Sequence, residues 1–462
     1  MKKYNSSLFI FRRDLRLADN SGLIAALKES KHVIPCFIFD PRQVETKNKY
    51  RSTNAIQFMI ESLKDLSEQL KKQNGRLYLF YGKAEEVVEK LLSTTSIDAV
   101  FINRDYTPFS TKRDAHIKKI CTQHEVSYEE NADALLNEPE DIQKKDGSFY
   151  SVFTPFYKNA SRIAVQEPAA FPSNGDWFTG TLDGTEKSTL YKTILPDENA
   201  DIAVNGGSAH GHTILNHLAH FNKYEHERNY PGILTSRLSA HLKFGTISVR
   251  QTYNAIVKHL GAHHPLLRQL YWRDFFTHIA HHAPHVFGHA YHTKYDSLKW
   301  DHSAAAFKAW STGNTGFPIV DAGMRELNTT GFMHNRVRMI VASFLVKDLH
   351  INWLSGEQYF AQQLVDYDAS VNNGNWQWSA STGCDAQPYF RIFNPWLQQK
   401  KYDPDCTYIK QWVPELDRYD AKTIHGYYKE NSPVIPGYPR PIVDHARESD
   451  LAKKMYKSTS RK

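Results

Sequence analysis

The sequence predicts three parts: an α/β part with a parallel sheet at the N-terminus, a long connector, and an all-α part that fills the C-terminal half. Three observations lead to this fold class. Short apolar runs alternate with amphipathic segments over about the first 135 residues, prolines punctuate the middle of the chain, and apolar residues then recur with a helical period. We therefore place the boundaries at 1–137, 138–207 and 208–462.

The pattern of apolar residues in the first part predicts five strands and four helices. The expected strands are 8–11, 33–40, 77–81, 99–103 and 126–129, and the expected helices are 20–28, 54–72, 84–92 and 111–123. Asn20 and Thr53 are expected to cap two of these helices. Regular βα alternation gives a parallel sheet with helices on both faces. The first strand runs into Arg12 and Arg13 instead of a GxGxxG loop, so we expect no NAD site there.

The connector and the C-terminal part differ in composition. Prolines and clusters of Gly and Ser, such as 173–175, indicate an irregular connector that packs on the surface. The C-terminal part predicts helices at 213–224, 235–243, 249–260, 266–281, 304–312, 319–329, 336–348 and 357–366. We expect the remainder to be rich in loops and to end in a basic tail, 453–462, that frays into solvent.

The composition excludes several classes of protein. Hydrophobic residues make up 41% and charged residues 23%, which is typical of a globular chain, and a net charge of +7 permits a polyanionic partner without requiring one. The four cysteines form no CxxC pair, which argues against a disulfide scaffold or zinc ribbon and fits a reducing compartment. No apolar run is long enough for a membrane span or a signal peptide. We expect a soluble cytoplasmic protein with no membrane partner.

The most informative stretch is 372–379, which sets small amides and a glycine beside two indoles, followed by further aromatic residues at 388–395. Eight of the nine tryptophans lie between Trp272 and Trp412. Such a stretch suits the wall of a site for a flat, polarisable ligand with a few hydrogen-bonding amides. A structural core rich in tryptophan fits the same residue types equally well.

Two other segments suit an anion and a nucleobase. The hydroxyls of 235–239 open a predicted helix, where free N–H groups favour phosphate, although a simple cap has the same residues. Gln269, Trp272 and Arg273 share one helix face, which suits stacking and hydrogen bonding to a base. An amphipathic helix with one buried Trp is the alternative interpretation of the second segment.

A third segment, 333–339, precedes a long apolar run. Asn335 is expected to cap the helix that starts there, and Arg338 is expected to pair with Asp366 or Asp368. That ion pair is either purely structural or, with Met339 nearby, part of a contact to a flat ligand and a phosphate.

Other catalytic motifs are missing from the sequence. Nine histidines lie between His259 and His292, yet HExxH is absent, so we predict no metal site. Neither a GxSxG elbow nor a GxxxxGK[ST] loop occurs, which argues against an ordinary hydrolase or phosphotransferase.

Taken together, five segments resemble the photolyase and cryptochrome family, and most closely the class I cyclobutane pyrimidine dimer (CPD) DNA photolyases. They are 11–20, 235–239, 271–275, 316–325 and 372–395, in the family's order, and the likeness covers nearly the whole chain. The resemblance implies an N-terminal α/β antenna domain, a C-terminal helical domain that holds reduced FAD, and a monomer that acts on UV-damaged DNA. Excited reduced FAD would give an electron to the dimer, the cyclobutane ring would split, and the electron would return.

The resemblance also implies a role for each site residue. The phosphates and ribityl chain of FAD would contact Tyr224, Thr235, Ser236, Leu238 and Ser239. Arg338 and Asp366 would pair beside the isoalloxazine ring, with Asp368 in contact with it and Asn372 facing its N5. Electrons would pass from the surface to the flavin through Trp300, Trp353 and Trp376. DNA and the flipped-out lesion would meet Arg228, Gln269, Trp272, Arg273, Asn335, Arg336, Met339 and Gln398.

Some residues depart from the family pattern. Gln269 stands where CPD photolyases often have Glu and where (6-4) photolyases have Gln, but the latter carry His at the positions of Asn335 and Met339. The CPD lesion is therefore favoured over the (6-4) alternative. Phe109 and Ser110 replace the Asn-Glu pair of folate-binding relatives. The antenna chromophore thus stays open between methenyltetrahydrofolate and a deazaflavin.

Two further functions compete with DNA repair. A cryptochrome would use the flavin to signal, but the chain ends about 64 residues after Gln398 without a low-complexity tail, which disfavours that interpretation. A flavoprotein oxidoreductase would need a nicotinamide site or an acid–base pair, and the sequence indicates neither.

Overall fold

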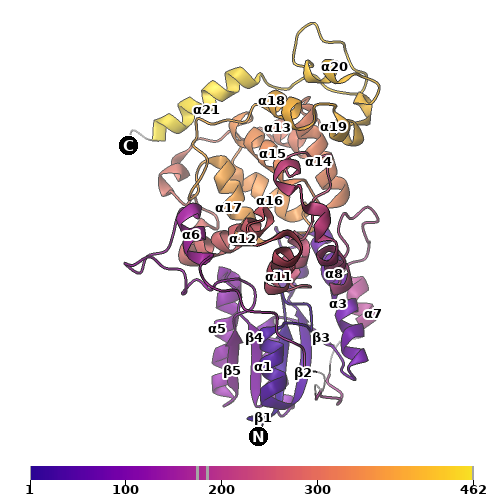
Figure 1. Ribbon diagram of the computed structural model, residues 1–462, viewed down its shortest axis with the longest axis vertical. Coiled ribbons are helices and arrows are strands. Elements are labelled where there is room, and N and C mark those ends of the chain that lie inside the picture. The colour runs from indigo at the N-terminus through magenta and orange to yellow at the C-terminus, as the bar shows by residue number, and fades with distance from the viewer. Residues whose placement is uncertain (1, 173–175, 184–186, 460–462) are drawn as a thin grey trace.

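Five parallel strands with their helices form one end of the molecule, and a larger body of helices forms the other (Figure 1). The computed structural model describes residues 2–172, 176–183 and 187–459. The glycine- and serine-rich cluster at 173–175 lies outside the described residues. The α/β plus all-α fold class predicted from the sequence is confirmed.

The sheet has the order β3-β2-β1-β4-β5, and every pair of neighbouring strands is parallel. Its strands are β1 (Tyr4–Phe11), β2 (Ser30–Phe39), β3 (Tyr78–Tyr81), β4 (Ala99–Asn103) and β5 (Ser127–Asn131). The chain moves outward from β1 to β3 on one side and then returns to β4 and β5 on the other. The topological switch point, where ligands of such sheets bind, therefore lies between β1 and β4.

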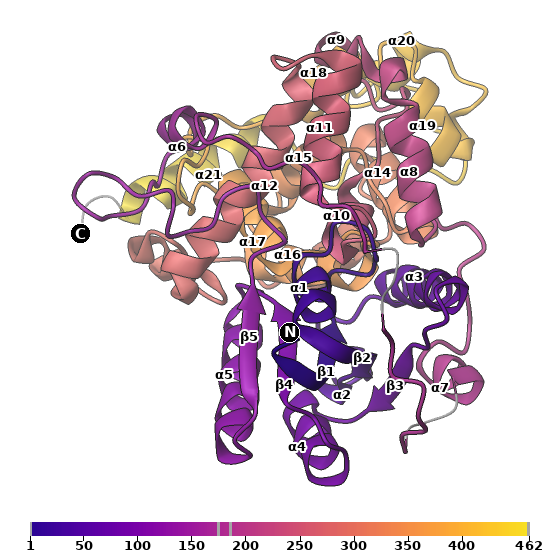
Figure 2. The same ribbon diagram turned by 60° about the horizontal axis from the view of Figure 1, so that its bottom comes forward.

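Helices cover both faces of this sheet (Figure 2). The helices of this part are α1 (Ser21–Glu29), α2 (Pro41–Val44), α3 (Thr53–Lys72), α4 (Ala84–Thr94) and α5 (Pro108–Gln123). Helices α1 and α3 pack on one apolar face, and α4 and α5 pack on the other. Asn20 caps α1 as predicted, whereas Ser52 rather than Thr53 caps α3, by accepting from the Ala55 N–H at 3.1 Å.

The segment after the sheet carries two short helices, α6 (Phe153–Ala160) and α7 (Lys187–Ile194). It is not merely a surface strap, because parts of it are buried in both bodies. Trp177 is buried against the sheet, where Val33 exchanges backbone hydrogen bonds with Asp176 and Phe178 at 2.9 Å each. Phe153 and Phe156 of α6 are buried against α12.

Helices make up most of the rest of the chain. The α-helices are α8 (Ser208–Asn216), α9 (Tyr224–Glu227), α10 (Ser239–Phe244), α11 (Val249–Leu260), α12 (Pro265–His282), α13 (Ala304–Ser311), α14 (Pro318–Thr330), α15 (Asn335–Lys347), α16 (Trp353–Gln363), α17 (Ala369–Ala380), α18 (Pro395–Tyr402), α19 (Thr407–Trp412), α20 (Ala421–His425) and α21 (His445–Thr459). Four 3-10 helices join them: Leu218–Phe221, Pro284–Val286, Thr293–Ser297 and Pro414–Leu416.

Three helix predictions were wrong at their boundaries. The single helix predicted at 213–224 is divided into α8, a 3-10 turn and α9, with Asn and His at the breaks. The helix predicted from 235 starts only at Ser239, because Arg237 adopts a φ of 49°, outside the helical range. The helix predicted at 357–366 starts at Trp353, where the Asn352 side chain accepts from the Leu354 N–H.

Two long helices were not predicted. Helix α17 contains Asn372, Asn373, Gly374 and Asn375, all weak helix formers, so packing rather than propensity sets it. Helix α21 occupies 445–459, where we expected loops and then, from 453, a frayed tail. Ala452 and Tyr456, four residues apart, are fully buried on its inner face. Residues 460–462 lie outside the described chain.

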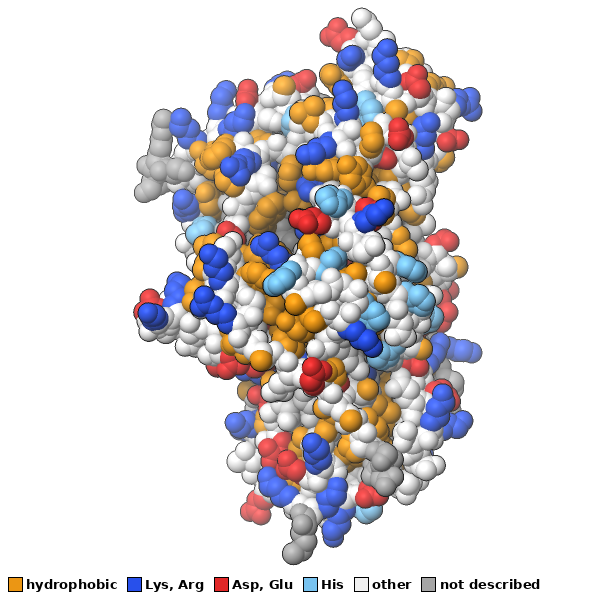
Figure 3. All heavy atoms as spheres, viewed as in Figure 1, with side chains coloured by type: hydrophobic (Ala, Val, Ile, Leu, Met, Phe, Trp, Pro, Cys, Tyr) orange, Lys and Arg blue, Asp and Glu red, His pale blue; other side chains and the backbone are white. Residues whose placement is uncertain are grey.

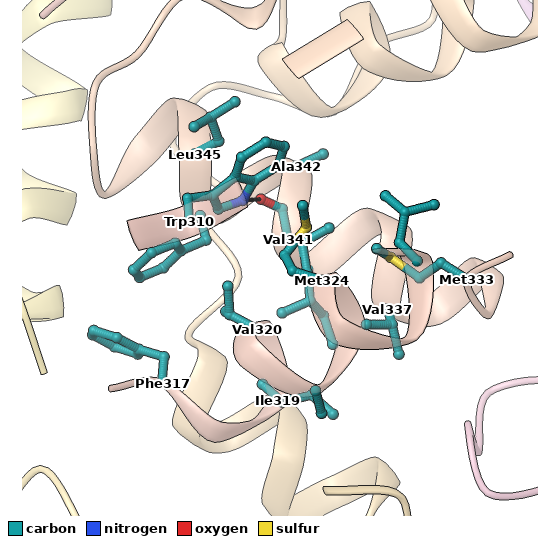
Figure 4. Close-up of a cluster of buried hydrophobic side chains, with 14 of the residues drawn as sticks. Trp310, Phe317, Ile319, Val320, Met324, Met333, Val337, Val341, Ala342 and Leu345 are labelled. Atoms are coloured by element: carbon teal, nitrogen blue, oxygen red, sulfur yellow. Dashed lines mark hydrogen bonds between the residues drawn. The ribbon is translucent and has the colours of Figure 1, made fainter. Parts of the chain in front are cut away.

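The largest hydrophobic core lies in the helical body. It is built around α14, α15, α16 and α17, and Trp310 sits inside it with its indole N–H donating to the Val341 carbonyl at 3.0 Å (Figure 4). This core gives α15 and α17 a rigid base from which polar side chains project. Among the described residues, no helix combines the length and the apolar character needed to cross a membrane.

Candidate active site

A buried carboxylate, Asp366, lies between α10 and α15. The guanidinium of Arg338 on α15 donates to Asp366 Oδ2 at 2.9 Å, and Ser239 Oγ donates to the same oxygen at 2.6 Å. Asp366 Oδ1 is also buried, yet it has no hydrogen-bond partner in the protein. Buried acceptors are rarely left unsatisfied. This oxygen therefore has the property expected of an atom that accepts from a ligand.

Asp368, two residues further, fixes the start of α17. Its Oδ1 accepts from the N–H groups of Ser370 and Val371 at 3.1 and 3.2 Å, and its Oδ2 accepts from the guanidinium of Arg13 at the end of β1. Burial opposes ionisation, but the positive charges of Arg13 and Lys243 outweigh it and lower the pKa of Asp368. The carboxylate thus joins α17 to the sheet.

Asn372 projects from the first turn of α17 and is buried. Its Nδ2 donates to the backbone carbonyl of Glu357 on α16 at 3.0 Å, and this hydrogen bond orients the amide. The carboxyl of Glu357 is itself buried, and burial raises its pKa to about 7 against the hydrogen bonds of Tyr50 and Asn372. The amide predicted to face N5 of FAD is therefore held rigidly.

The residues predicted to hold the phosphates and the ribityl chain lie on short elements. Thr235 and Ser236 belong to the irregular turn before α10, Leu238 is the buried residue at its N-terminus, and Ser239 begins the helix. Tyr224 begins α9, and Arg228 follows that helix within hydrogen-bonding reach of the Tyr224 hydroxyl. Of this group, the described hydrogen bonds connect Ser239 directly to Asp366.

The three predicted relay tryptophans share one core. Trp376 on α17 and Trp353 at the start of α16 are buried members of the largest cluster, and Trp300 packs against it from the surface side. The ring of Trp376 also lies 6.2 Å from that of Trp310, which sequence reasoning did not single out. The order of burial matches a path from the interior to the surface.

Apart from Arg228, which follows α9, the predicted lesion contacts come from α12, α15 and α18. On α15, Asn335 is exposed and its amide lies 3.9 Å from the sulfur of Met339, four residues on. Arg336 donates to Asn229 Oδ1 at 2.6 Å and lies 4.5 Å from the ring centre of Tyr402. Gln398 on α18 has a buried Oε1 without a partner in the protein. Asn335 does not cap α15, because the ring of His334 accepts from the Arg336 N–H instead.

On α12 the three predicted residues do not behave alike. Gln269 and Trp272 are half-buried, and the ring of Trp272 stacks on Phe153 of α6 with centroids 3.6 Å apart and planes 6° apart. Arg273 instead turns inward, where it donates to the carbonyls of Ala134 and Leu242 at 2.6 and 3.3 Å. The expectation that Arg273 shares a ligand-facing surface with Gln269 and Trp272 is not supported by these contacts.

Arg273 lies beside an unusual acid. Asp274 is completely buried, and burial raises its pKa to about 7 although Arg273 and two backbone N–H groups favour the charged form. Those N–H groups belong to Leu136 and Asn137, at 2.8 and 3.3 Å from Oδ2. The pair therefore anchors the chain that leaves the sheet.

Sequence reasoning missed several residues of the site. Arg13 and Phe153 are far from the helical part in sequence, and no pattern connects them to Asp368 and Trp272. Trp378, a half-buried indole on α17, was noticed only as one of a pair. The signal that could have shown a difference in exposure is the spacing of Trp376 and Trp378, because residues two apart lie on different faces of a helix.

A cavity of about 620 Å³ opens at the carboxyl ends of β1, β2 and β4. Five guanidinium groups line it, from Arg12, Arg13, Arg42, Arg51 and Arg113. On the other side it reaches Ala369 and Asn373 of α17. The cavity thus occupies the switch point of the sheet and extends to the helix that carries Asn372.

The wall of this cavity combines an aromatic ring with charge. The guanidinium of Arg42 lies 5.0 Å from the ring centre of Phe109, and Ser110 Oγ donates to Asp105 at 2.8 Å. Burial opposes ionisation of Asp105, but the neighbouring arginines lower its pKa below the usual range. A flat ligand with an anionic part fits such surroundings.

Family models match both ends of the chain. The model described as DNA photolyase matches residues 7–173, and the model described as the FAD binding domain of DNA photolyase matches residues 266–458. Deoxyribodipyrimidine photo-lyases from Alkalihalophilus pseudofirmus and Escherichia coli are each 36% identical to the chain. The alignments cover 97% and 96% of this chain and 97% of each relative.

Solved structures agree with these matches. A photolyase from Sulfolobus tokodaii with two FAD molecules is 43% identical, with a TM-score of 0.89 over 98% of this chain and 100% of that one. A class III photolyase from Agrobacterium tumefaciens is 34% identical, with a TM-score of 0.92 over 100% and 99%. Because family models, full-length relatives and folds coincide, the chain belongs to the DNA photolyase family.

Proposed function

We propose that this protein repairs cyclobutane pyrimidine dimers in DNA with light, by means of a reduced FAD held between α10, α15 and α17. The observation that carries the proposal is the buried, unpartnered Asp366 Oδ1, on a carboxylate whose other oxygen is fixed by Arg338 and Ser239. The full-length relatives named deoxyribodipyrimidine photo-lyase support the choice of substrate.

The residues present fit FAD. Asp366 Oδ1 offers an acceptor for a ring N–H, Arg338 pairs with the other carboxylate oxygen at 2.9 Å, and Asn372 presents a fixed amide. The hydroxyls of Thr235, Ser236 and Ser239 and the ring of Tyr224 would hold the rest of the molecule. When bound and reduced, FAD supplies the electron that opens the cyclobutane ring after absorption of blue light, and accepts it again.

The protein's own residues would position the flavin, shield it from water and connect it to the surface for electron transfer. The core around α14 to α17 excludes water from the flavin site, which keeps the hydrogen bonds of Asp366 and Asn372 strong. Trp376, Trp353 and Trp300 would carry electrons inward from the surface, because indoles are the most easily oxidised of the ordinary aromatic side chains. No acid or base has to be tuned for this chemistry.

The lesion would be bound by α12, α15 and α18. Gln269, Asn335 and Gln398 offer amides to base edges, while Trp272 and Met339 offer flat or soft apolar contact. Arg228 and Arg336 would contact the DNA backbone, whereas Arg273, which turns inward, would only hold α12 in place through the carbonyls of Ala134 and Leu242. Figure 3 shows Lys and Arg side chains spread over this face around a hollow with hydrophobic walls, which suits a nucleic acid.

We further propose that the cavity at the switch point holds a light-harvesting chromophore of the flavin or deazaflavin type. Phe109, stacked with Arg42, offers a ring face, and the surrounding arginines suit a phosphate-bearing tail. The archaeal relative that is 43% identical has two FAD molecules. Extraction of the purified protein followed by chromatography should release a second flavin-like compound, and release of methenyltetrahydrofolate would contradict this part.

We assign residues 1–137 to the antenna domain, 138–207 to the connector and 208–462 to the helical domain. We also place the protein in the cytoplasm, as a monomer associated with DNA. All four cysteines are buried and free, as suits a reducing compartment. Size-exclusion chromatography with light scattering should give the mass of one chain.

One experiment tests the repair function. The protein is reduced, mixed with an oligonucleotide that carries a single thymine dimer, and illuminated with blue light, while a dark sample and a (6-4) photoproduct oligonucleotide serve as controls. We expect loss of the dimer only in the illuminated CPD sample. A cryptochrome-type flavin photoreceptor, the alternative function, would be photoreduced but would leave the dimer intact.

A further inference from the structure

Trp272 is held from one side by a ring that belongs to the connector. Phe153, the first residue of α6, stacks on the indole almost in parallel, with ring centroids 3.6 Å apart. Phe153 is buried to 99%, because only 1% of it is exposed, whereas Trp272 is half-buried. One face of the indole is therefore unavailable to any ligand, and Phe275 and Phe276 of α12 also contact the ring. Only the surface of the half-buried ring that these neighbours leave free can meet a base.

Phe153 is itself held by the neighbouring rings of Phe156, Tyr157 and Phe275 and by two polar contacts. Its N–H donates to Asp385 Oδ2 at 3.0 Å, from the loop that follows α17, and the guanidinium of Arg268 lies 5.6 Å from its ring centre. Asp385 adopts a left-handed φ of 46°, which turns this loop toward α6. The ring that supports Trp272 is thus connected to the end of the helix that carries Asn372.

We propose that Phe153 is a positioning residue for DNA lesion recognition: it holds Trp272 in the orientation in which the indole meets the flipped-out dimer. This inference rests on the proposed repair function and gives the connector a part in it. A ring locked before binding loses less conformational freedom when the ligand arrives, so the lesion is bound more tightly.

The same helix offers a matched control. Phe156 is equally buried, 1% exposed, and its ring contacts Phe275, His278 and, at 6.4 Å, Phe153, but not Trp272. Phe153→Leu and Phe156→Leu therefore remove the same ring from the same core, but only the first removes a ring that stacks directly on Trp272. General loss of packing affects both variants, whereas loss of positioning affects one.

The experiment compares binding of a thymine-dimer oligonucleotide with binding of the undamaged oligonucleotide, in the full FAD-loaded protein. We expect Phe153→Leu to lower the preference for the dimer by about threefold to tenfold, which is the range of one aromatic pair. Phe156→Leu should keep the wild-type preference within about twofold. Repair at saturating dimer should proceed at the wild-type rate in both variants.

A double-mutant cycle separates positioning from other effects. If Phe153 acts through Trp272, then Phe153→Leu should add no further loss in a Trp272→Ala background. Asp385→Ala gives a second route to the same answer, because Asp385 is exposed and its loss only frees the N-terminus of α6. We expect it to lower the preference about twofold, with the exposed Asp405→Ala as its control.

Three results would overturn the inference. Equal preferences in Phe153→Leu and Phe156→Leu, or additive losses in the cycle, would reject positioning while leaving the repair function intact, provided that wild type prefers the dimer and Trp272→Ala weakens that preference. A wild-type protein that binds damaged and undamaged DNA equally would overturn both the inference and the proposed function.

Discussion

Two carboxylates two residues apart do different work in this molecule. Asp368 is fully engaged, since it caps α17 and pairs with Arg13. Asp366 is only half engaged, because Arg338 and Ser239 hold one oxygen and the other has no protein partner. A purely structural carboxylate would not need to leave a buried acceptor empty. This difference between the two residues is the reason for proposing that FAD binds beside Asp366.

At the same scale, the relay makes a prediction for Trp300. Replacing it by Phe keeps an aromatic ring but removes an easily oxidised one, so light should no longer reduce oxidised FAD in the protein. Repair should remain near the wild-type level when FAD is reduced chemically beforehand. Absorption spectra during illumination and dimer assays before and after chemical reduction measure the two effects.

The half-buried Trp412 provides the control for this prediction. Trp412→Phe removes an indole from the rim of the same core but outside the proposed path, and photoreduction should continue. If repair with pre-reduced FAD also disappeared in Trp300→Phe, the residue would belong to the lesion or flavin site and the relay assignment would be wrong.

Asp274 predicts a dependence of stability on pH. Its pKa is about 7 in the folded protein and near 3.8 in the unfolded chain, because burial disfavours its charge. Between these values the folded state keeps a proton that the unfolded state has lost, so this group's contribution falls as pH rises from about 4 to 7, by at most about 1.4 kcal/mol per pH unit.

The substitution Asp274→Asn tests this sign. Because Asn does not titrate, the free energy of unfolding of the variant should gain on that of wild type as pH rises through this window, and the difference should level off above pH 7. Urea denaturation at several pH values measures it. The exposed Asp141→Asn should show no such trend, and a difference that does not change with pH would contradict the assignment.

At the scale of elements, sequence patterns succeeded where burial follows a simple period. The strands and helices of the sheet, and α11, α12, α14 and α15, lie within a few residues of the predicted ranges. Helix α17 was missed because its first turns are amides and glycine, whose helical state depends on the Asp368 cap and on the surrounding core. The stretch 372–379 was thus the most informative about the site, although its helical structure could not be predicted from the sequence.

The candidate site, like the fold, could be predicted only in part from the sequence. The Arg338–Asp366 ion pair was foreseen, because the resemblance fixes those positions. The inward orientation of Arg273 was not foreseen. Three residues on one helix face can extend from a half-exposed edge to a buried one, and Arg273 lies at the buried edge. The contact of Phe153 with Trp272 depends on how the connector folds back, and no periodicity in the sequence encodes that.

Helix α21 provides a prediction at this scale. The ring of Tyr456 is completely buried, with Lys347 Nζ 3.5 Å from its centre, and its hydroxyl donates to the Ala380 carbonyl at 2.5 Å. Tyr456→Ala should lower the free energy of unfolding by about 3–5 kcal/mol, as for other large buried aromatics. Thermal or urea unfolding measures the loss.

The exposed Lys454→Ala on the same helix should change stability by less than about 0.5 kcal/mol. If Tyr456→Ala changed the free energy of unfolding as little as Lys454→Ala, the packing of α21 against α15 and α17 would not contribute to stability.

At the scale of the whole molecule, the sheet and the helical body meet at a network of charges. Arg13, at the end of β1, pairs with Asp105 on its own side at 3.2 Å and with Asp368 at the start of α17. The cavity at the switch point ends at the same place, since Arg13 and Ala369 both line it. A chromophore in that cavity would therefore lie close to the helix that carries Asn372, as energy transfer between two chromophores requires.

This junction makes the last prediction. Arg13→Met leaves Asp368 and Asp105 buried without their shared cation, and breaking a buried pair in this way should cost about 3–5 kcal/mol of stability. Asp368→Asn should cost less, because Asn still caps α17 and Arg13 keeps Asp105. The double variant should lose less than the sum of the two, by about 0.5–3 kcal/mol, as measured by urea denaturation. The exposed pair Asp450 and Lys453, joined at 3.0 Å on α21, should show almost no coupling in the same experiment. Additive losses at Arg13 and Asp368 would mean that this ion pair does not help to hold the two bodies together.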